Sequence, residues 1–64
     1  MAGVKRINNG KVTIEVGRAN MVSKGVYRGR AVTVIQIVQN LDVFSVYVRM
    51  QDGTETWISP YDLG

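Results

Sequence analysis

The chain has 64 residues with no Cys or His, and its eight Lys and Arg against five Asp and Glu give a net charge of +3. This length allows one domain, residues 1–64, with a small core, and the composition excludes disulfides and metal sites built on Cys or His. No apolar run reaches the ~18 residues of a membrane span, and the start MAGVKRINNG lacks the apolar segment of a signal peptide, so we expect a cytoplasmic protein.

A β-hairpin is the first predicted element, in VKRINNGKVTIEV at residues 4–16. Asn9-Gly10 between two apolar-bearing runs favours a two-residue turn that pairs Ile7 with Val12. Apolar and polar residues then alternate, which predicts one face toward the core and one toward solvent. The apolar set is Val12, Ile14 and Val16, and the polar set is Lys11, Thr13 and Glu15.

Turn residues separate the next elements. GRAN at 17–20 predicts a turn, and residues 21–22 begin a short extended piece before the loop KGVYRGR at 24–30. The longest predicted strand covers residues 31–38, where the apolar residues stop alternating after Val34. That change indicates either two partly covered faces or a β-bulge.

A cleanly alternating strand is predicted at residues 43–50, after the connection NLD at 40–42. Its apolar residues share one face, and a mixed set of residues shares the other. The apolar face carries Phe44, Val46, Val48 and Met50, and the other face carries Val43, Ser45, Tyr47 and Arg49.

QDG at 51–53 turns the chain into a last strand, and two registers compete there. A two-residue turn pairs Val48 with Trp57, whereas a three-residue loop with Gly53 in a left-handed bulge position shifts the pairing by one residue. The pairs of the second register are Arg49 with Glu55, Tyr47 with Trp57, and Val46 with Ile58. We favour this register because it opposes two opposite charges and two aromatic rings, while the other register would exchange the faces.

The segment SPYDL predicts one helical turn, with Ser59 as the cap and Pro60 in the first position. Tyr61 and Leu63 are then expected to close one end of the fold. The fold class is therefore all-β, with five to six short strands and a terminal 3-10 turn, and a small barrel would hide the strand edges.

GRAVTVIQIV and VYVRMQDGTETWISPYDL resemble the SH3-like small barrels of the KOW and Tudor type, over residues 24–63. The residues of KGVYRGRAVTV that fit a KOW motif are Gly25, Tyr27, Arg28, Gly29 and Val34, whereas Val32 stands where that family has a glycine. The KOW resemblance implies contact with RNA or a polymerase. The Tudor resemblance implies an aromatic cage for methylated basic side chains, for which the candidates are Tyr27, Tyr47, Trp57 and Tyr61.

Conventional catalysis is not expected, because the chain has no His and its carboxylates are scattered over turns and strands. The basic loop instead predicts binding: Lys24, Arg28 and Arg30 can contact phosphates while Tyr27 stacks on a base. The alternative is structural, with the glycines turning the chain and Tyr27 packing. We therefore predict no enzyme, no metal and no cofactor.

A second candidate site combines Tyr47, Arg49 and Trp57, which point outward together in the favoured register. They can form a stacking platform for bases or a hot spot for a protein partner. The alternative is that Trp57 covers one end of the barrel and is buried. Near the N-terminus, Lys5, Arg6 and Lys11 are expected to protect a strand edge rather than to bind.

The function predicted from these residues is a non-catalytic module that binds RNA or DNA with low sequence specificity, or that associates with a nucleic-acid machine. Its binding residues would be Lys24, Tyr27, Arg28, Arg30, Tyr47, Arg49 and Trp57. The alternative is a protein-interaction or assembly module, either a homo-oligomer or a small phage or mobile-element protein that docks on a larger complex. Membrane partners are not expected, and the sequence leaves RNA, DNA and protein ligands open.

Overall fold

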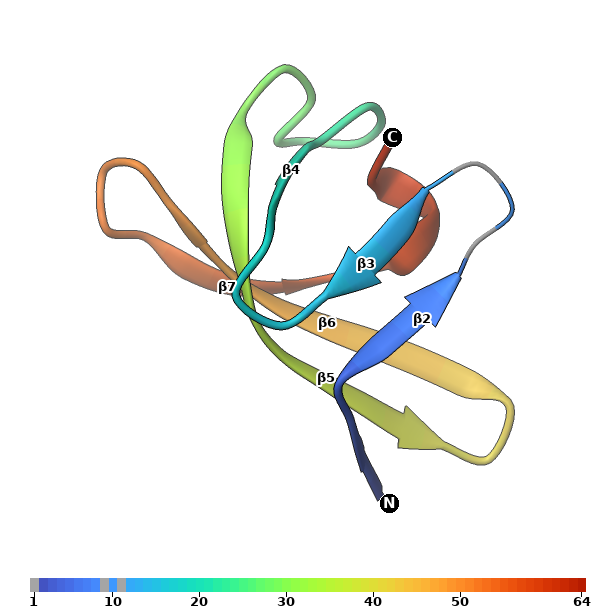
Figure 1. Cartoon of the computed structure of the whole chain (residues 1–64). Coiled ribbons are helices and arrows are strands. Elements are labelled where there is room, and N and C mark those ends of the chain that lie inside the picture. The colour runs from blue at the N-terminus through green and yellow to red at the C-terminus, as the bar shows by residue number, and fades with distance from the viewer. Residues whose placement is uncertain (1, 9, 11) are drawn as a thin grey trace.

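A computed structural model describes residues 2–8, 10 and 12–64 (Figure 1). This part of the chain is all-β, as predicted, with seven strands in place of the expected five or six. The strands are β1 (Ala2–Val4), β2 (Arg6–Asn8), β3 (Thr13–Glu15), β4 (Ala19–Met21), β5 (Ala31–Asn40), β6 (Val43–Met50) and β7 (Glu55–Ile58). A 3-10 turn, η1 (Pro60–Asp62), follows them.

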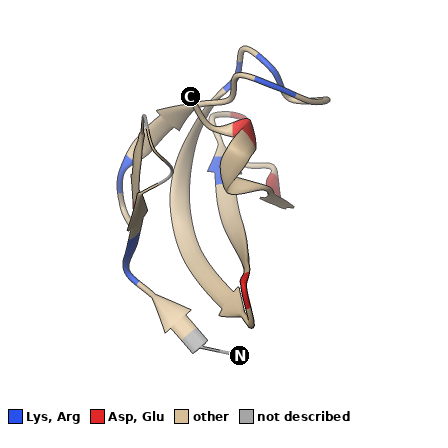
Figure 2. Ribbon diagram, turned by 90° about the vertical axis from the view of Figure 1, so that its right-hand side faces the viewer, with Lys and Arg blue, Asp and Glu red and all other residues tan. Residues whose placement is uncertain are grey.

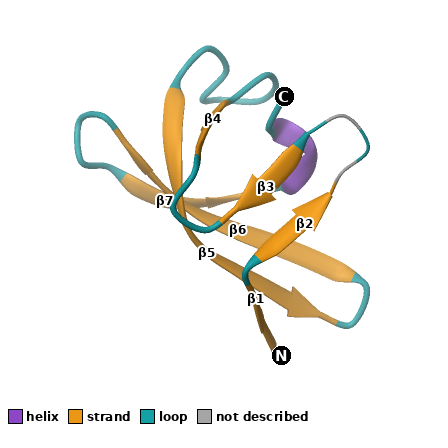
Figure 3. Cartoon of the chain, in the orientation of Figure 1, coloured by secondary structure: helices purple, strands orange, loops and turns teal. Residues whose placement is uncertain are grey.

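The strands form two antiparallel sheets (Figure 3). The larger sheet has the order β1-β5-β6-β7, with β4 also paired to β5. The smaller sheet is the β2–β3 hairpin, which lies in front of β5 and β6 in Figure 1. Both sheets are open in their strand pairing, and an isolated bridge between Val22 and Leu63 links the end of β4 to the C-terminus.

The core lies between the two sheets. The apolar face predicted for residues 43–50 is confirmed, because Val46, Val48 and Met50 are buried there. From the smaller sheet Ile14 is fully buried, and each such side chain contributes about 1.5–3 kcal/mol by leaving water. The buried residues that form one core cluster are Ile14, Val22, Val32, Val34, Ile37, Val46, Val48, Met50 and Leu63.

A β-bulge in β5 confirms one of the two explanations for the loss of alternation. The β5–β6 register shifts between Val34 and Gln36. Val34 and Ile37 therefore both face the core, although they are separated by an odd number of positions.

The N-terminal hairpin forms, but its predicted pairing is wrong. Ile7 pairs with Ile14 and Asn8 with Thr13, not Ile7 with Val12. The two registers differ by two residues and place the same side chains on the core face, so the apolar pattern did not separate them. The predicted turn residue Asn9 and the predicted solvent-facing Lys11 lie outside the described residues.

The connection after β3 also differs from expectation. Val16 was placed on the core face but is 41% exposed, because the chain already turns at Val16 and Gly17. The predicted turn at 17–20 is correspondingly wrong in part, since Ala19 and Asn20 belong to β4. Gly17 has a φ of 91° and donates its N–H to Val34 O at 2.7 Å, which anchors this turn to β5.

The predicted helical turn is confirmed at η1, with Ser59 as cap and Pro60 at its start. Leu63 is buried as expected. Tyr61 is 74% exposed, so the prediction that it closes one end of the fold is wrong. A 3-10 turn has three residues per turn, so Pro60 and Leu63 share the buried face and Tyr61 points away from it.

The β5–β6 turn contains a non-glycine residue in the left-handed region, Leu41, with a φ of 57° and 87% exposure. This conformation costs a leucine about 1–2 kcal/mol and costs asparagine less. We expect Leu41→Asn to raise the free energy of unfolding by about 0.5–1 kcal/mol, measured by urea denaturation. Val43→Asn is the control, since it introduces the same side chain at an exposed strand position; equal effects would contradict the explanation.

Candidate binding surfaces

The favoured register of the β6–β7 hairpin is confirmed: Tyr47 pairs with Trp57 and Arg49 with Glu55. A three-residue loop sets this register, with Gly53 at a φ of 92°. The N–H of Gly53 donates to Met50 O at 3.0 Å, and the N–H of Met50 donates to Thr54 O at 2.7 Å. The loop geometry thus places the two aromatic side chains on the outer face of the larger sheet.

The outer aromatic patch is our name for Tyr47, Trp57 and the groove beside them. The two ring centroids are 4.9 Å apart with the planes tilted by 51°. Trp57 is 51% exposed, as the favoured register predicts, so the alternative in which it is buried at a barrel end is wrong. The groove has a volume of about 220 Å³ and is lined by Val38, Asn40, Ser45 and Trp57.

Glu55 neutralises Arg49, the cation of this face among the described residues. Its Oε2 accepts a hydrogen bond from Arg49 Nε at 2.8 Å, and its Oε1 accepts one from the Tyr47 hydroxyl at 3.0 Å. The bond from Arg49, followed by that from Tyr47, lowers the pKa of the Glu55 carboxyl. The same bond to Glu55 raises the pKa of the Tyr47 hydroxyl. The patch therefore offers aromatic surface with little net charge.

The basic loop, defined as residues 23–30, is held in a fixed shape by backbone bonds. Gly25 and Gly29 have φ values of 88° and 89°, which the two reversals of the chain require. The N–H of Gly29 donates to Val22 O at 2.8 Å, and the N–H of Ser23 donates to Asp62 O at 2.7 Å. The loop is thereby fastened both to the end of β4 and to η1.

The four site residues predicted in this loop have different surroundings. Lys24 and Arg28 are exposed and form no ion pair with the described residues. Tyr27 is half-buried against the core, as the structural alternative expected. Arg30 lies 3.7 Å from Asp52 Oδ2, and its Nη1 donates to Met50 Sδ at 3.8 Å.

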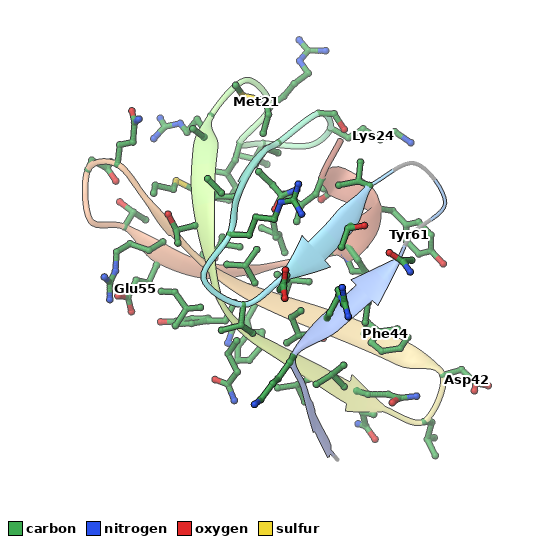
Figure 4. The ribbon with its side chains drawn as sticks, in the orientation of Figure 1. Met21, Lys24, Asp42, Phe44, Glu55 and Tyr61 are labelled. Carbon is green, nitrogen blue, oxygen red and sulfur yellow. The ribbon has the colours of Figure 1, made fainter. Side chains whose placement is uncertain are left out.

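The seven predicted residues do not form one patch. Figure 4 shows Lys24 and Glu55 on opposite sides of the molecule, and Glu55 marks the outer aromatic patch. Arg30 contacts Met50, on the core face of β6, whereas Arg49 extends from the outer face. The structure brings together Tyr47, Arg49 and Trp57, whereas Lys24 and Arg28 share only the basic loop.

Tyr61 is a candidate binding residue that the sequence analysis expected to close one end of the fold and otherwise named only as a candidate for the aromatic cage. Its exposed ring borders a groove of about 570 Å³ that also contains Lys24. The three-residue period of the turn that begins at Pro60 was the signal that could have placed Tyr61 outside. The groove is lined by Gly10, Val12, Ser23, Lys24, Tyr61, Leu63 and Gly64.

Comparisons with protein-family models, with curated proteins and with solved structures find no match for this chain. Within residues 2–8, 10 and 12–64, no cluster of three or more acidic side chains is arranged to hold a metal ion. No helix in the described part of the chain has the length and hydropathy needed to cross a membrane.

The hydrogen bonds that Glu55 accepts are expected to make the stability of the fold depend on pH. A carboxyl whose pKa is lower in the folded state stabilises the fold above its unfolded pKa and loses that contribution as pH falls through the folded value. As the pH is lowered from about 5 to about 2, we expect the urea concentration at the unfolding midpoint to decrease less steeply in Glu55→Gln than in the parent chain. The measurement is urea denaturation across this range, with Glu15→Gln as control. Identical acid limbs for Glu55→Gln and the parent would contradict the role of Glu55.

Proposed function

We propose that this chain is a non-catalytic module with an SH3-like barrel fold that binds single-stranded RNA or DNA with low sequence specificity. Binding would occur on the side that carries the basic loop. The observation that carries this proposal is the distribution of free and neutralised cations. Because phosphate contacts dominate non-specific nucleic-acid binding, the position of free cations indicates where the strand would lie.

Two of the described arginines already have carboxylate partners: Arg49 contacts Glu55 and Arg30 contacts Asp52. The remaining described cations form no ion pair with described residues, although Glu15 lies opposite Arg6 in the hairpin register. They are Lys5, Arg6, Arg18, Lys24 and Arg28. In Figure 2 blue marks the basic loop at the top and the side of the β2–β3 hairpin, and red marks η1 as well as other segments.

The proposed barrel fold requires the open sheets to close on each other. Two contacts support closure of the sheets: the Val22–Leu63 bridge, and the hydrogen bond from Val34 N–H to Arg18 O at 3.0 Å. The first joins the C-terminal segment to the end of β4, and the second joins the β3–β4 connection to β5. Such contacts reduce the exposed backbone edges that an open sheet would present.

A charge-matched pair of variants tests the binding surface. Lys24→Gln/Arg28→Gln and Arg30→Gln/Arg49→Gln remove the same net charge, but only the first removes cations without ion pairs. We expect the first variant to weaken binding and to reduce the slope of log K against log salt by about 1.4, the value for two phosphate contacts to a single strand. The measurement is fluorescence anisotropy with labelled oligo-dT, oligo-U and a duplex at several salt concentrations.

The second variant should bind nearly as well as the parent chain, because its arginines are already neutralised. No binding of any of these oligonucleotides at low salt would contradict the proposed function. Equal losses in both variants would contradict the assignment of phosphate binding to the cations without ion pairs, Lys24 and Arg28, since the effect would then follow net charge alone.

Self-association through the outer aromatic patch is a second candidate function. It is favoured by one observation: Trp57 is half-exposed on a face whose only described cation is neutralised by Glu55. Tryptophan and tyrosine in such neutral surroundings are typical of protein-interface hot spots. Val43, also on this face of β6, is 64% exposed and would extend the apolar contact.

Sedimentation velocity tests this candidate. We expect the parent chain to form dimers as its concentration rises and Trp57→Ser to stay monomeric. Tyr61→Ser is the matched control because it removes an exposed aromatic ring from another surface, and it should still associate. A parent chain that stays monomeric at every concentration would exclude self-association by this face.

A further inference from the structure

Two grooves meet at the ring of Tyr61. The first is the groove that contains Lys24, described above. The second has a volume of about 230 Å³ and lies between the N-terminal hairpin and η1, lined by Ile7, Asn8, Phe44, Pro60 and Tyr61. Figure 4 shows Lys24, Tyr61 and Phe44 along the same side of the molecule. A ligand that passes over Tyr61 would therefore contact a cation on one side and an apolar slot on the other.

The backbone that carries the exposed Tyr61 ring is fixed by the local structure. Ser59 Oγ accepts the N–H of Tyr61 at 3.2 Å, and Pro60 is buried next to it. Leu63 fixes the far end of the turn in the core. Because the backbone is already ordered, a ligand that stacks on this ring pays little conformational entropy for the backbone that carries it.

The second groove has the chemistry of a slot for a flat, partly polar ring. Ile7, Phe44 and Pro60 give apolar walls, and Asn8 adds an amide at the rim. The Oδ1 of Asn8 accepts a hydrogen bond from Thr13 Oγ1 at 2.9 Å. The amide N–H groups of Asn8 make no hydrogen bond with the described residues, so they can donate to an acceptor on a ligand.

We propose that one unstacked base of a single-stranded nucleic acid enters this second groove and stacks on Tyr61, while a neighbouring phosphate contacts Lys24. This inference rests on the proposed function and names the ligand group that the surface accepts. Charge favours a nucleic acid over an apolar peptide, because a cation lines the adjoining groove and neither lining contains an acidic side chain. The Asp62 carboxylate lies close to Gly25 and is not part of either lining.

The donors of Asn8 also indicate which bases fit. A base that presents a carbonyl oxygen at its edge, such as thymine or uracil, can accept from the Asn8 amide. A base without such an acceptor keeps only the stacking contact. Since stacking is available to every base, the preference for thymine or uracil is expected to be modest.

The test compares a labelled dT oligomer of about eight nucleotides with an abasic oligomer of the same length and charge. Tyr61→Ala should weaken binding of the dT oligomer by at least about fivefold, the low end of the range for loss of one stacked base. Tyr61→Phe should bind like the parent chain because it keeps the ring. Binding of the abasic oligomer should be weak and equal for all three proteins. A matching U oligomer shows whether the strand is RNA, DNA or either.

The outcomes separate this inference from the proposed function. If Lys24→Gln/Arg28→Gln weakens binding while Tyr61→Ala does not, the strand is bound by its phosphates and the base slot is wrong. The same conclusion follows if Tyr61→Ala weakens dT and abasic oligomers equally. If an uncharged apolar peptide binds in a Tyr61-dependent way and no oligonucleotide competes with it, the groove is a peptide site. If no oligonucleotide binds the parent chain at low salt, both proposals fail together.

Discussion

Strand β5 pairs with β1, β4 and β6, and its two halves must both present apolar residues to the same core. A strand with strict alternation could not do so with this sequence, because Val34 and Ile37 are three positions apart. The bulge between Val34 and Gln36 resolves this conflict by adding one residue to β5 without a counterpart in β6. The sheet bends there, as bulged strands do.

The positions of both surfaces follow from the sheet and its connections. The outer aromatic patch exists because the β6–β7 register sends Tyr47 and Trp57 away from the core. The basic loop and Tyr61 lie where the end of β4 meets η1. Hydrogen bonds from Ser23 to Asp62 O hold the loop against η1. The patch and the loop are consequently built by different segments and face different directions, so one substitution at either surface is expected to leave the other unchanged.

Ion pairing decides which chemistry each surface can offer. Arg49 and Arg30 are bound to carboxylates, so a phosphate would have to displace Glu55 or Asp52 to reach them. Lys24 and Arg28 need no such exchange. A basic residue counted from composition is thus not equivalent to a basic residue that is available for binding. The net charge of +3 does not show where on the molecule the free cations lie.

Local rules predicted those elements whose geometry is set within a few residues. The Gly53 loop and the Ser59 cap each leave a signature in adjacent positions, and the structure contains both. The lost alternation after Val34 indicated the β5 bulge as one of two explanations, and the structure contains the bulge. The first hairpin was mispaired because a shift of two residues keeps Ile7 and Ile14 on the core face. Nothing near Arg30 in the sequence indicates Asp52, which is 22 positions later in the chain.

Chain order has a consequence for how this sheet assembles. Strands β5, β6 and β7 are consecutive and joined by short turns, so their pairing requires little loop closure. The pairs Ala2 with Gln39 and Val22 with Leu63 instead join segments that are distant in the chain. Contacts between distant segments form slowly because the closure entropy is lost before the contact is gained. We expect the meander of β5–β7 to fold first, and both ends of the chain to dock on it afterwards.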